Sequence, residues 1–253
     1  MSTSDHQKLR GSWLVAGWLL LILSGGLMSS LIRAPQVLSS MTPILVMSHL
    51  IGGAAMTIMA IARLGYAKEM MRSWRLLLLA ATPALGWLAY RSFSPLRATT
   101  HAAVAAVASL ALAHRSRRSV TERTSPQRSW TLILAIVGFS LVLVQVVVGA
   151  ALRHHVMSLS WHLVVGGLAT MAVLAAAIAT TQDQHTTVTE RRAARSAIAA
   201  VVLQVSLGVA VLFMIFVGPP NAATWITVTV AHVLGGSLTL LAVGRFIAAV
   251  GAS

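Results

Sequence analysis

The sequence predicts an all-α membrane protein with eight transmembrane helices, arranged as two duplicated four-helix bundles. The prediction rests on an apolar composition, on apolar runs long enough to cross a bilayer, and on polar residues that recur at matching places in the two halves. Of the 253 residues, 57% are hydrophobic and 9% are charged. About a quarter of the residues of a soluble domain are charged, so the composition excludes an ordinary soluble protein.

Each predicted span is an apolar run of about 20 residues, the length at which a helix crosses the hydrocarbon core with its backbone groups bonded internally. The first run follows a polar start, MSTSDHQKLRG, and has no small-residue cleavage site, which predicts a retained span rather than a signal peptide. The eight predicted spans are 13–33, 43–64, 74–91, 98–114, 130–152, 157–180, 196–218 and 224–249.

The basic residues predict the topology. Most lysines and arginines lie before the first span, after each even-numbered span or at the end of the last one. By the positive-inside rule, both termini of this multi-pass protein are then cytoplasmic, and the expected location is the bacterial cytoplasmic (inner) membrane. The net charge of +14 therefore predicts contact with anionic membrane lipids and no nucleic-acid partner. The remaining loops face outward and hold only Arg33, Arg91, Arg97 and Arg153.

The two halves of the chain resemble each other. A basic run at 113–129 separates them, which predicts an N-terminal bundle at 1–120 and a C-terminal bundle at 121–253. Within the second half, a glutamine is followed four residues later by a glycine in two spans, at Gln145 and at Gln204. In each half, the second and fourth spans carry a histidine near the predicted outer end, and these histidines are His49, His101, His162 and His232.

The four histidines predict metal ligands, one cross-bundle pair in each half. A zinc or copper site would need three or four donors close together, and the chain has no cysteine. A proton relay would need acids inside the spans, whereas all five acidic residues lie in predicted cytoplasmic segments. Heme iron accepts an imidazole on each axial face, and its macrocycle needs apolar walls. The alternative for any single histidine is a hydrogen-bonded packing residue.

Small residues and arginines extend this candidate site. Glycines follow three of the histidines on the same helix face, where the lack of a side chain would leave a clearing for a flat porphyrin or would allow close helix packing. The predicted outer arginines, Arg33, Arg91, Arg97 and Arg153, suit either the heme propionates or lipid headgroups. The glycines of the candidate site are Gly52, Gly53, Gly166, Gly235 and Gly236.

The eight spans, the four placed histidines and the phrase QVVVGAALRHH at 145–155 together resemble the heme A synthase family of cytochrome oxidase assembly proteins. The resemblance covers nearly the whole chain in topology, through short motifs. It implies a heme b cofactor held by His162 and His232, and processing of heme O to heme A near His49 and His101. The implied reaction oxidises a porphyrin methyl group through hydroxylation to a formyl group.

Two positions depart from the family pattern. Val46 stands three residues before His49, where the family has a catalytic glutamate, and the loop at 33–42 lacks the cysteine pair of many bacterial members. Three functions therefore stay open. They are a divergent heme A synthase-like oxidoreductase, a diheme b-type cytochrome subunit transferring electrons between quinone and a partner redox protein, and a heme-binding assembly or regulatory protein without turnover. Membrane redox or oxidase-assembly proteins are the expected partners.

Overall fold

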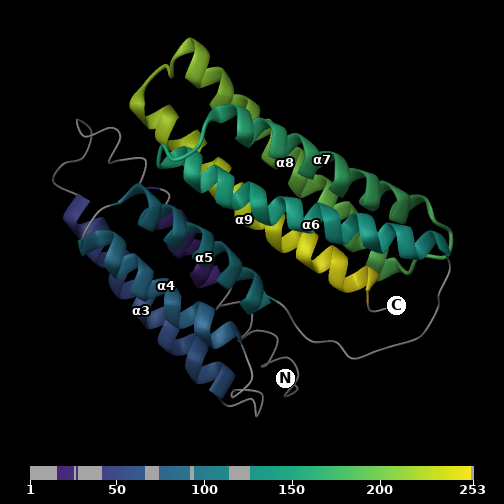
Figure 1. Ribbon diagram of the computed structural model, residues 1–253, viewed down its shortest axis with the longest axis horizontal. Coiled ribbons are helices and arrows are strands. Elements are labelled where there is room, and N and C mark those ends of the chain that lie inside the picture. The colour runs from purple at the N-terminus through teal and green to yellow at the C-terminus, as the bar shows by residue number, and fades with distance from the viewer. Residues whose placement is uncertain are drawn as a thin grey trace. The chain divides into compact units, whose positions relative to one another are not determined.

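The structure, a computed structural model, describes residues 16–25, 27, 42–65, 74–91, 94–113 and 126–251. These residues form α-helices joined by turns (Figure 1), and the described ranges contain no strand. A first helical stretch at 16–25 precedes the longer helices. These are α3 (Thr42–Gly65), α4 (Trp74–Arg91), α5 (Pro95–Ala113), α6 (Pro126–Arg153), α7 (Leu159–Gln182), α8 (Val188–Val217) and α9 (Ala222–Val250).

The helical class is confirmed, and every predicted span from 43–64 onward coincides with one of these helices. Four helices, α6 to α9, are long and apolar enough to cross a membrane. Shorter apolar stretches lie at 16–25 and 44–59. Several apolar helices thus indicate a membrane-embedded protein, while the count of eight spans and the duplication stay predictions.

Helix α8 begins at Val188 rather than at the predicted residue 196, and its cap gives the reason. The backbone N–H of Thr187 donates to Glu190 Oε2 at 2.6 Å, and the backbone N–H of Glu190 donates to Thr187 Oγ1 at 3.2 Å. This reciprocal capping box satisfies two backbone donors that a helix start otherwise leaves unpaired. The polar first turns of α8 are therefore helical although they are not apolar.

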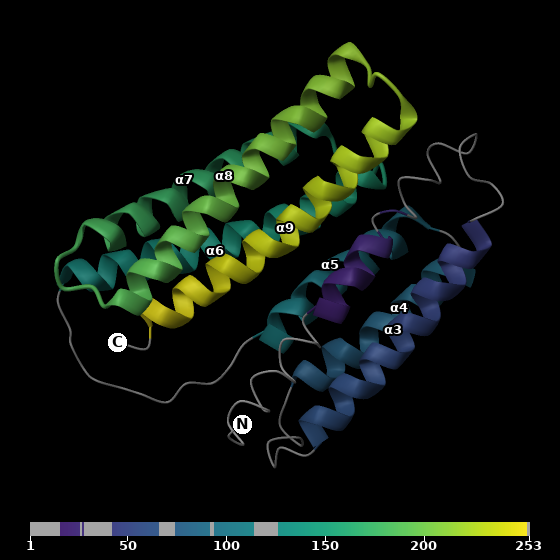
Figure 2. The ribbon, with the colours of Figure 1, turned by 180° about the vertical axis from the view of Figure 1, so that it is seen from behind.

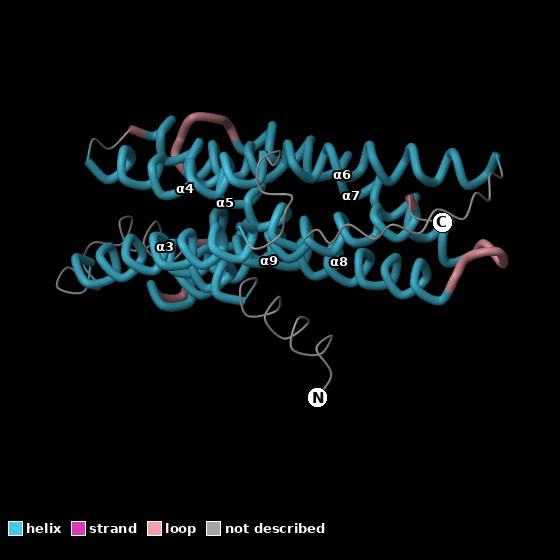
Figure 3. Tube along the Cα trace, turned by 90° about the horizontal axis from the view of Figure 1, so that it is seen from below, coloured by secondary structure: helices cyan, strands magenta, loops and turns pink. Residues whose placement is uncertain are grey.

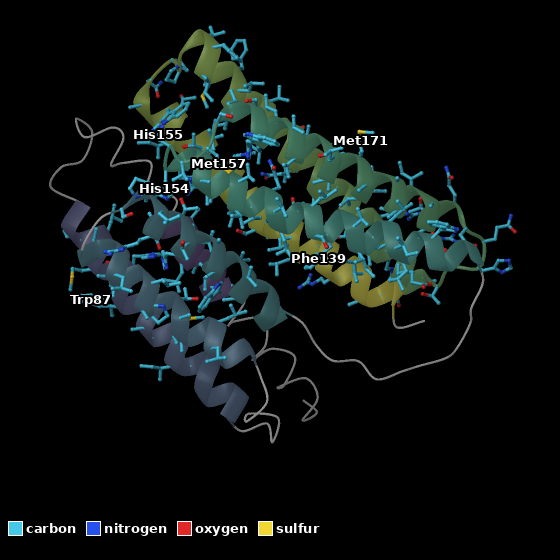
Figure 4. All side chains as sticks on the ribbon, in the orientation of Figure 1. Trp87, Phe139, His154, His155, Met157 and Met171 are labelled. Carbon is cyan, nitrogen blue, oxygen red and sulfur yellow. The ribbon has the colours of Figure 1, made fainter. Side chains whose placement is uncertain are left out.

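The connections between α6, α7, α8 and α9 are short loops (Figure 3). After α6, the N–H of Val156 donates to the Ala151 carbonyl at 2.8 Å, and that of His155 donates to the Leu152 carbonyl at 3.1 Å. This is a Schellman ending, and His155 occupies its left-handed position with φ 59°. Figure 4 shows His154 and His155 at this turn. Before α9, Asn221 Oδ1 accepts from the backbone N–H of Thr224 at 2.8 Å.

The described helices group into two compact units. The first unit comprises residues 1–113 and 210–234, and the second comprises 114–209 and 235–253. The predicted division into 1–120 and 121–253 stays a prediction.

In the first unit, the stretch at 16–25 packs with α3, α4 and α5. Trp18 is 2% exposed, and its indole N–H donates to the Ala105 carbonyl of α5 at 3.0 Å. Trp18 forms a buried cluster with Met56 of α3 and Ala108 of α5. The residues packed against this cluster are Leu21, Ile22 and Leu78.

In the second unit, α6 runs alongside α7 (Figures 1 and 2). The contact is close at Gly138, where an added Cβ would lie 2.9 Å from Val173 Cγ2 and 3.1 Å from the Val173 backbone nitrogen. The first part of α8 contacts the second part of α9, because Thr239 Oγ1 donates to the Ala200 carbonyl at 3.1 Å. Glycine, alanine and threonine thus bring these helix backbones together.

Side-chain size is distributed as expected for helices that face lipid. Large apolar side chains lie on the outside, as for Trp130 and Met171, which are 68% and 70% exposed, and Met171 points away from the helices in Figure 4. Many interior residues are small, which suits helix association in lipid by close packing, although Phe246 and Leu240 are also fully buried. The buried alanines are Ala108, Ala135, Ala150, Ala151, Ala169, Ala176, Ala177, Ala194, Ala197 and Ala242.

Candidate functional site

The structure brings together the two predicted histidines of the first half. His49 lies on α3 and His101 on α5, and their imidazole ring centres are 6.1 Å apart with the ring planes perpendicular. Neither is an exposed residue. The two rings are therefore neighbours, while their predicted role as a ligand pair stays a prediction.

The hydrogen bond of His101 determines which ring nitrogen carries the hydrogen. Its Nδ1 lies 3.0 Å from the backbone carbonyl oxygen of Thr82 on α4. A carbonyl oxygen only accepts, so Nδ1–H is the donor. In a neutral imidazole the second nitrogen, Nε2, is then bare, with a lone pair available to a metal ion.

His49 also carries its hydrogen on Nδ1, and its acceptor is a hydroxyl. Ser24 Oγ lies 2.8 Å from His49 Nδ1 and 2.9 Å from the carbonyl oxygen of Leu21. The single hydroxyl hydrogen is used on the Leu21 carbonyl, so Ser24 accepts from Nδ1–H of His49. The Nε2 atom of His49 is therefore bare as well.

His49 and His101 are the described residues that could hold a heme iron, and this role stays a prediction. Metal-binding histidines usually donate their other N–H to a carbonyl or another acceptor, which orients the ring and sets its tautomer. Among the described residues, no group of three or more histidines and acids gathers to hold a bare metal ion. Two imidazoles suffice where a porphyrin supplies the other four ligands.

Each of three histidine rings lies against a glycine of the preceding helix. A Cβ added at these glycines would come within 3.0 to 3.1 Å of the imidazole Cε1, so only glycine allows this approach without a shift of the ring. The sequence predicted glycines on the same helix as each histidine, and these glycines of the preceding helix were not predicted. The signal was the glycine at a similar depth in the preceding span. The three pairs are Gly25 with His49, Gly86 with His101, and Gly149 with His162.

The same-helix glycines of the second half face glutamines. A Cβ added at Gly166 would lie 2.8 Å from Gln145 Nε2, and one added at Gly235 would collide with Gln204 Oε1. Gly236 also faces Gln204, whose Nε2 would lie 3.4 Å from an added Cβ. The space beside these residues is thus taken up by side chains of the preceding helix, a different use of glycine from the predicted porphyrin clearing.

The same-helix glycines of the first half have no glutamine against them. A Cβ added at Gly52 would lie 3.2 Å from Leu21 Cδ2, and one added at Gly53 would meet nothing within 4 Å. Only Gly53 therefore has the open surroundings that the sequence analysis expected.

His162 has a different polar partner from the first pair. Gln145 Nε2 lies 3.0 Å from its Nδ1, 3.3 Å from its Nε2 and 3.1 Å from its backbone carbonyl oxygen. His232 is half-buried in α9 and falls in the first compact unit, whereas His162 falls in the second. Pairing of these two histidines stays a prediction.

The predicted outer arginines lie at helix ends. Arg91 is the last residue of α4, Arg97 is exposed in the first turn of α5, and Arg153 is the half-buried last residue of α6. Arg33 lies outside the described residues. Contact of these arginines with propionates stays a prediction.

Comparison of the chain with family models, with curated proteins and with solved structures found no match. The functional argument therefore rests on the residues and their geometry.

Proposed function

We propose that this chain is a heme-binding integral membrane protein that acts as a heme A synthase-like oxidoreductase, converting heme O to heme A for cytochrome oxidase biogenesis. The observation that carries the proposal is the pair formed by His49 and His101. Their ring centres are 6.1 Å apart, and both Nδ1 atoms are engaged by acceptors, so that both Nε2 atoms are bare. The proposed cofactor is one or two heme b groups, with heme O and heme A as substrate and product in the N-terminal half.

The residues of the first half would hold and orient the heme. His49 and His101 would supply the axial nitrogens, while Ser24 and the Thr82 carbonyl keep the rings from rotating. Heme, when bound, supplies an iron that exchanges electrons. The surrounding helices are apolar, which would favour retention of the macrocycle. In the proposed topology of eight spans in a bacterial inner membrane, with both termini cytoplasmic, Arg33, Arg91, Arg97 and Arg153 lie on the outer side and would pair with propionates.

A second candidate function is that of a diheme b-type cytochrome that passes electrons from quinone to a partner protein. Val46 favours this function. This half-buried residue lies on α3, one turn before His49, where the resembling family has an acid. All five carboxylates of the chain are outside the predicted spans. Oxidation of a methyl group needs a group that manages protons, whereas bis-imidazole electron transfer does not.

The first experiment records the absorption spectrum of the full chain purified from heme-replete cells. Low-spin b-type Soret and α bands are expected, because two imidazole ligands give a low-spin iron. A heme-free protein under these conditions would overturn both functions.

The second experiment expresses the chain in cells that make heme O but lack heme A synthase. Heme A in extracted pigments would establish the enzyme. Its absence with intact heme binding would favour the cytochrome. Val46→Glu, with Val46→Gln as the matched control, then tests whether the acid alone is missing, because only the carboxylate would restore heme A.

A further inference from the structure

Gln145 contacts His162 through one nitrogen atom that lies near three polar atoms of that residue. Its Nε2 lies 3.1 Å from the His162 backbone carbonyl oxygen, 3.0 Å from the ring Nδ1 and 3.3 Å from the ring Nε2. An amide nitrogen can donate two hydrogen bonds and accepts no hydrogen bond. One N–H is used on the carbonyl oxygen, so the other is donated to the ring, where Nδ1 is the nearer atom.

This donation assigns the opposite tautomer to His162. Because Nδ1 accepts, the hydrogen of the neutral imidazole is on Nε2. In His49 and His101 the hydrogen is on Nδ1 and Nε2 is bare. A ring nitrogen that carries a hydrogen has no lone pair for a metal ion, so Nε2 of His162 is not available as a ligand in this tautomer.

The amide oxygen of Gln145 adds a second observation. Gln145 Oε1 is buried and has no hydrogen-bond partner among the described residues. The amide fits beside α7 because residue 166 is glycine, since a Cβ there would lie 2.8 Å from Gln145 Nε2. A buried acceptor without a donor costs free energy. Rotation of the amide would exchange the hydrogen bond to the His162 backbone carbonyl for one that Nδ1–H donates to the amide oxygen.

We infer that Gln145 is a positioning residue that selects the tautomer of His162. With the amide nitrogen toward the ring, His162 carries its hydrogen on Nε2. With the amide oxygen toward the ring, Nδ1–H donates to Gln145 and Nε2 becomes bare. The consequence for heme binding rests on the proposed function, whereas the tautomer itself does not.

The test is nitrogen-15 NMR of the heme-free, full-length protein in lipid nanodiscs, with labelled histidine. A bare ring nitrogen resonates well apart from one that carries a hydrogen, and His162→Asn identifies the signals of His162. We expect Nδ1 bare and Nε2–H for His162, and the reverse for His49 and His101. A wild-type protein with Nδ1–H on His162 overturns the inference.

Two variants test whether the side-chain amide of Gln145 sets the tautomer of His162. Gln145→Glu replaces the donor by a carboxylate acceptor, so the tautomer of His162 is expected to invert. Gln145→Leu removes the donor at similar size, so the Nδ1 signal is expected to shift as its hydrogen bond is lost. Gln204→Leu, the same change on α8, is the matched control and is expected to leave the signals of His162 unchanged. An unaltered His162 spectrum in Gln145→Leu, or failure of a folded Gln145→Glu to invert, overturns the inference.

Heme titration of the same samples separates the two proposals. If Gln145 governs the tautomer and the protein binds heme, Gln145→Glu is expected to raise the heme affinity of the second half about 10-fold or more, the scale of effects of groups behind a metal ligand. If the tautomers are as inferred but no variant binds heme, the proposed function fails and the inference holds. If heme binds but the tautomers are not those inferred, the inference about Gln145 fails and the proposed function holds.

Discussion

The regions around His101 and His162 have the same packing of a ring against a glycine, but the two rings differ in their hydrogen bonds. His101 in the first unit and His162 in the second each place their ring against a glycine of the preceding helix, Gly86 and Gly149. The Nδ1 of His101 donates to a backbone carbonyl, whereas that of His162 accepts from the amide of Gln145. Packing of a ring against a helix can thus recur while the ring nitrogen offered to a ligand changes.

The difference originates on the helix that precedes each histidine. At the place matching Gln145, the first half has Ile22, which packs against the cluster around Trp18. Ser24 then provides an acceptor for His49. The His49 ring therefore has a hydroxyl acceptor where the His162 ring has an amide donor. Metal ligation by either half stays a prediction.

The largest expected effect comes from removal of a ring in each region. His101→Leu should abolish the bis-imidazole spectrum of the first half and weaken heme binding by more than the 10- to 100-fold typical of groups behind a ligand. His162→Leu should leave this first heme in place. Heme titration followed by absorbance measures both, and His185→Ala, a change at an exposed loop residue, is the control. If both substitutions remove the same heme, the two regions are not independent.

Groups behind the ligands should have the next largest effect. Ser24→Ala removes the acceptor of His49 Nδ1–H and should lower heme affinity about 10- to 100-fold. Thr82→Val should change it little, because the backbone carbonyl of Thr82, not its side chain, accepts from His101. Equal losses in the two variants, measured by heme titration, would contradict the roles assigned to these acceptors.

Substitutions of the glycines beside the rings test the ring-to-glycine packing that is found in both regions. Gly86→Ala and Gly149→Ala each place a Cβ within 3.0 to 3.1 Å of a ring carbon, and each should lower the free energy of unfolding by about 1 to 3 kcal/mol. Gly167→Ala meets nothing within 4 Å and should be neutral or stabilising by up to about 1 kcal/mol. Unfolding in mixed micelles measures all three. A destabilised Gly167→Ala would mean that helix packing rather than the ring is being probed.

The smallest effect should come from the hydrogen bond of the Trp18 indole in the first unit. Trp18→Phe removes the hydrogen bond to the Ala105 carbonyl and should cost about 1 kcal/mol of unfolding free energy, measured in the same micelles. Trp161→Phe is the matched control, because Trp161 is 59% exposed on α7. An equal cost in both variants would argue against a specific role of Trp18 in placing the stretch that carries Ser24.

Much of the helical layout could be predicted from apolar runs alone, because in lipid a run of sufficient length has no alternative to a helix. The start of α8 could not, since the first turn contains the polar run 189–192 and its helix depends on the capping box of Thr187 and Glu190. The pair formed by His49 and His101 could be predicted from their placement on alternate spans. Their hydrogen-bond partners could not, because one of them is the backbone carbonyl of Thr82, which any residue type possesses.

By itself, the sequence determined the helical class, the membrane-embedded character and the choice of histidine as the candidate ligand, since composition and residue type carry those directly. The tertiary structure decided which nitrogen of each ring is engaged and which glycine makes room for it. Those depend on the distance between atoms of different helices, such as the 3.0 Å from Gln145 to His162 and the 2.8 Å from Ser24 to His49. Neither a periodicity nor a motif records such distances, because the side chains that meet come from different segments of the chain.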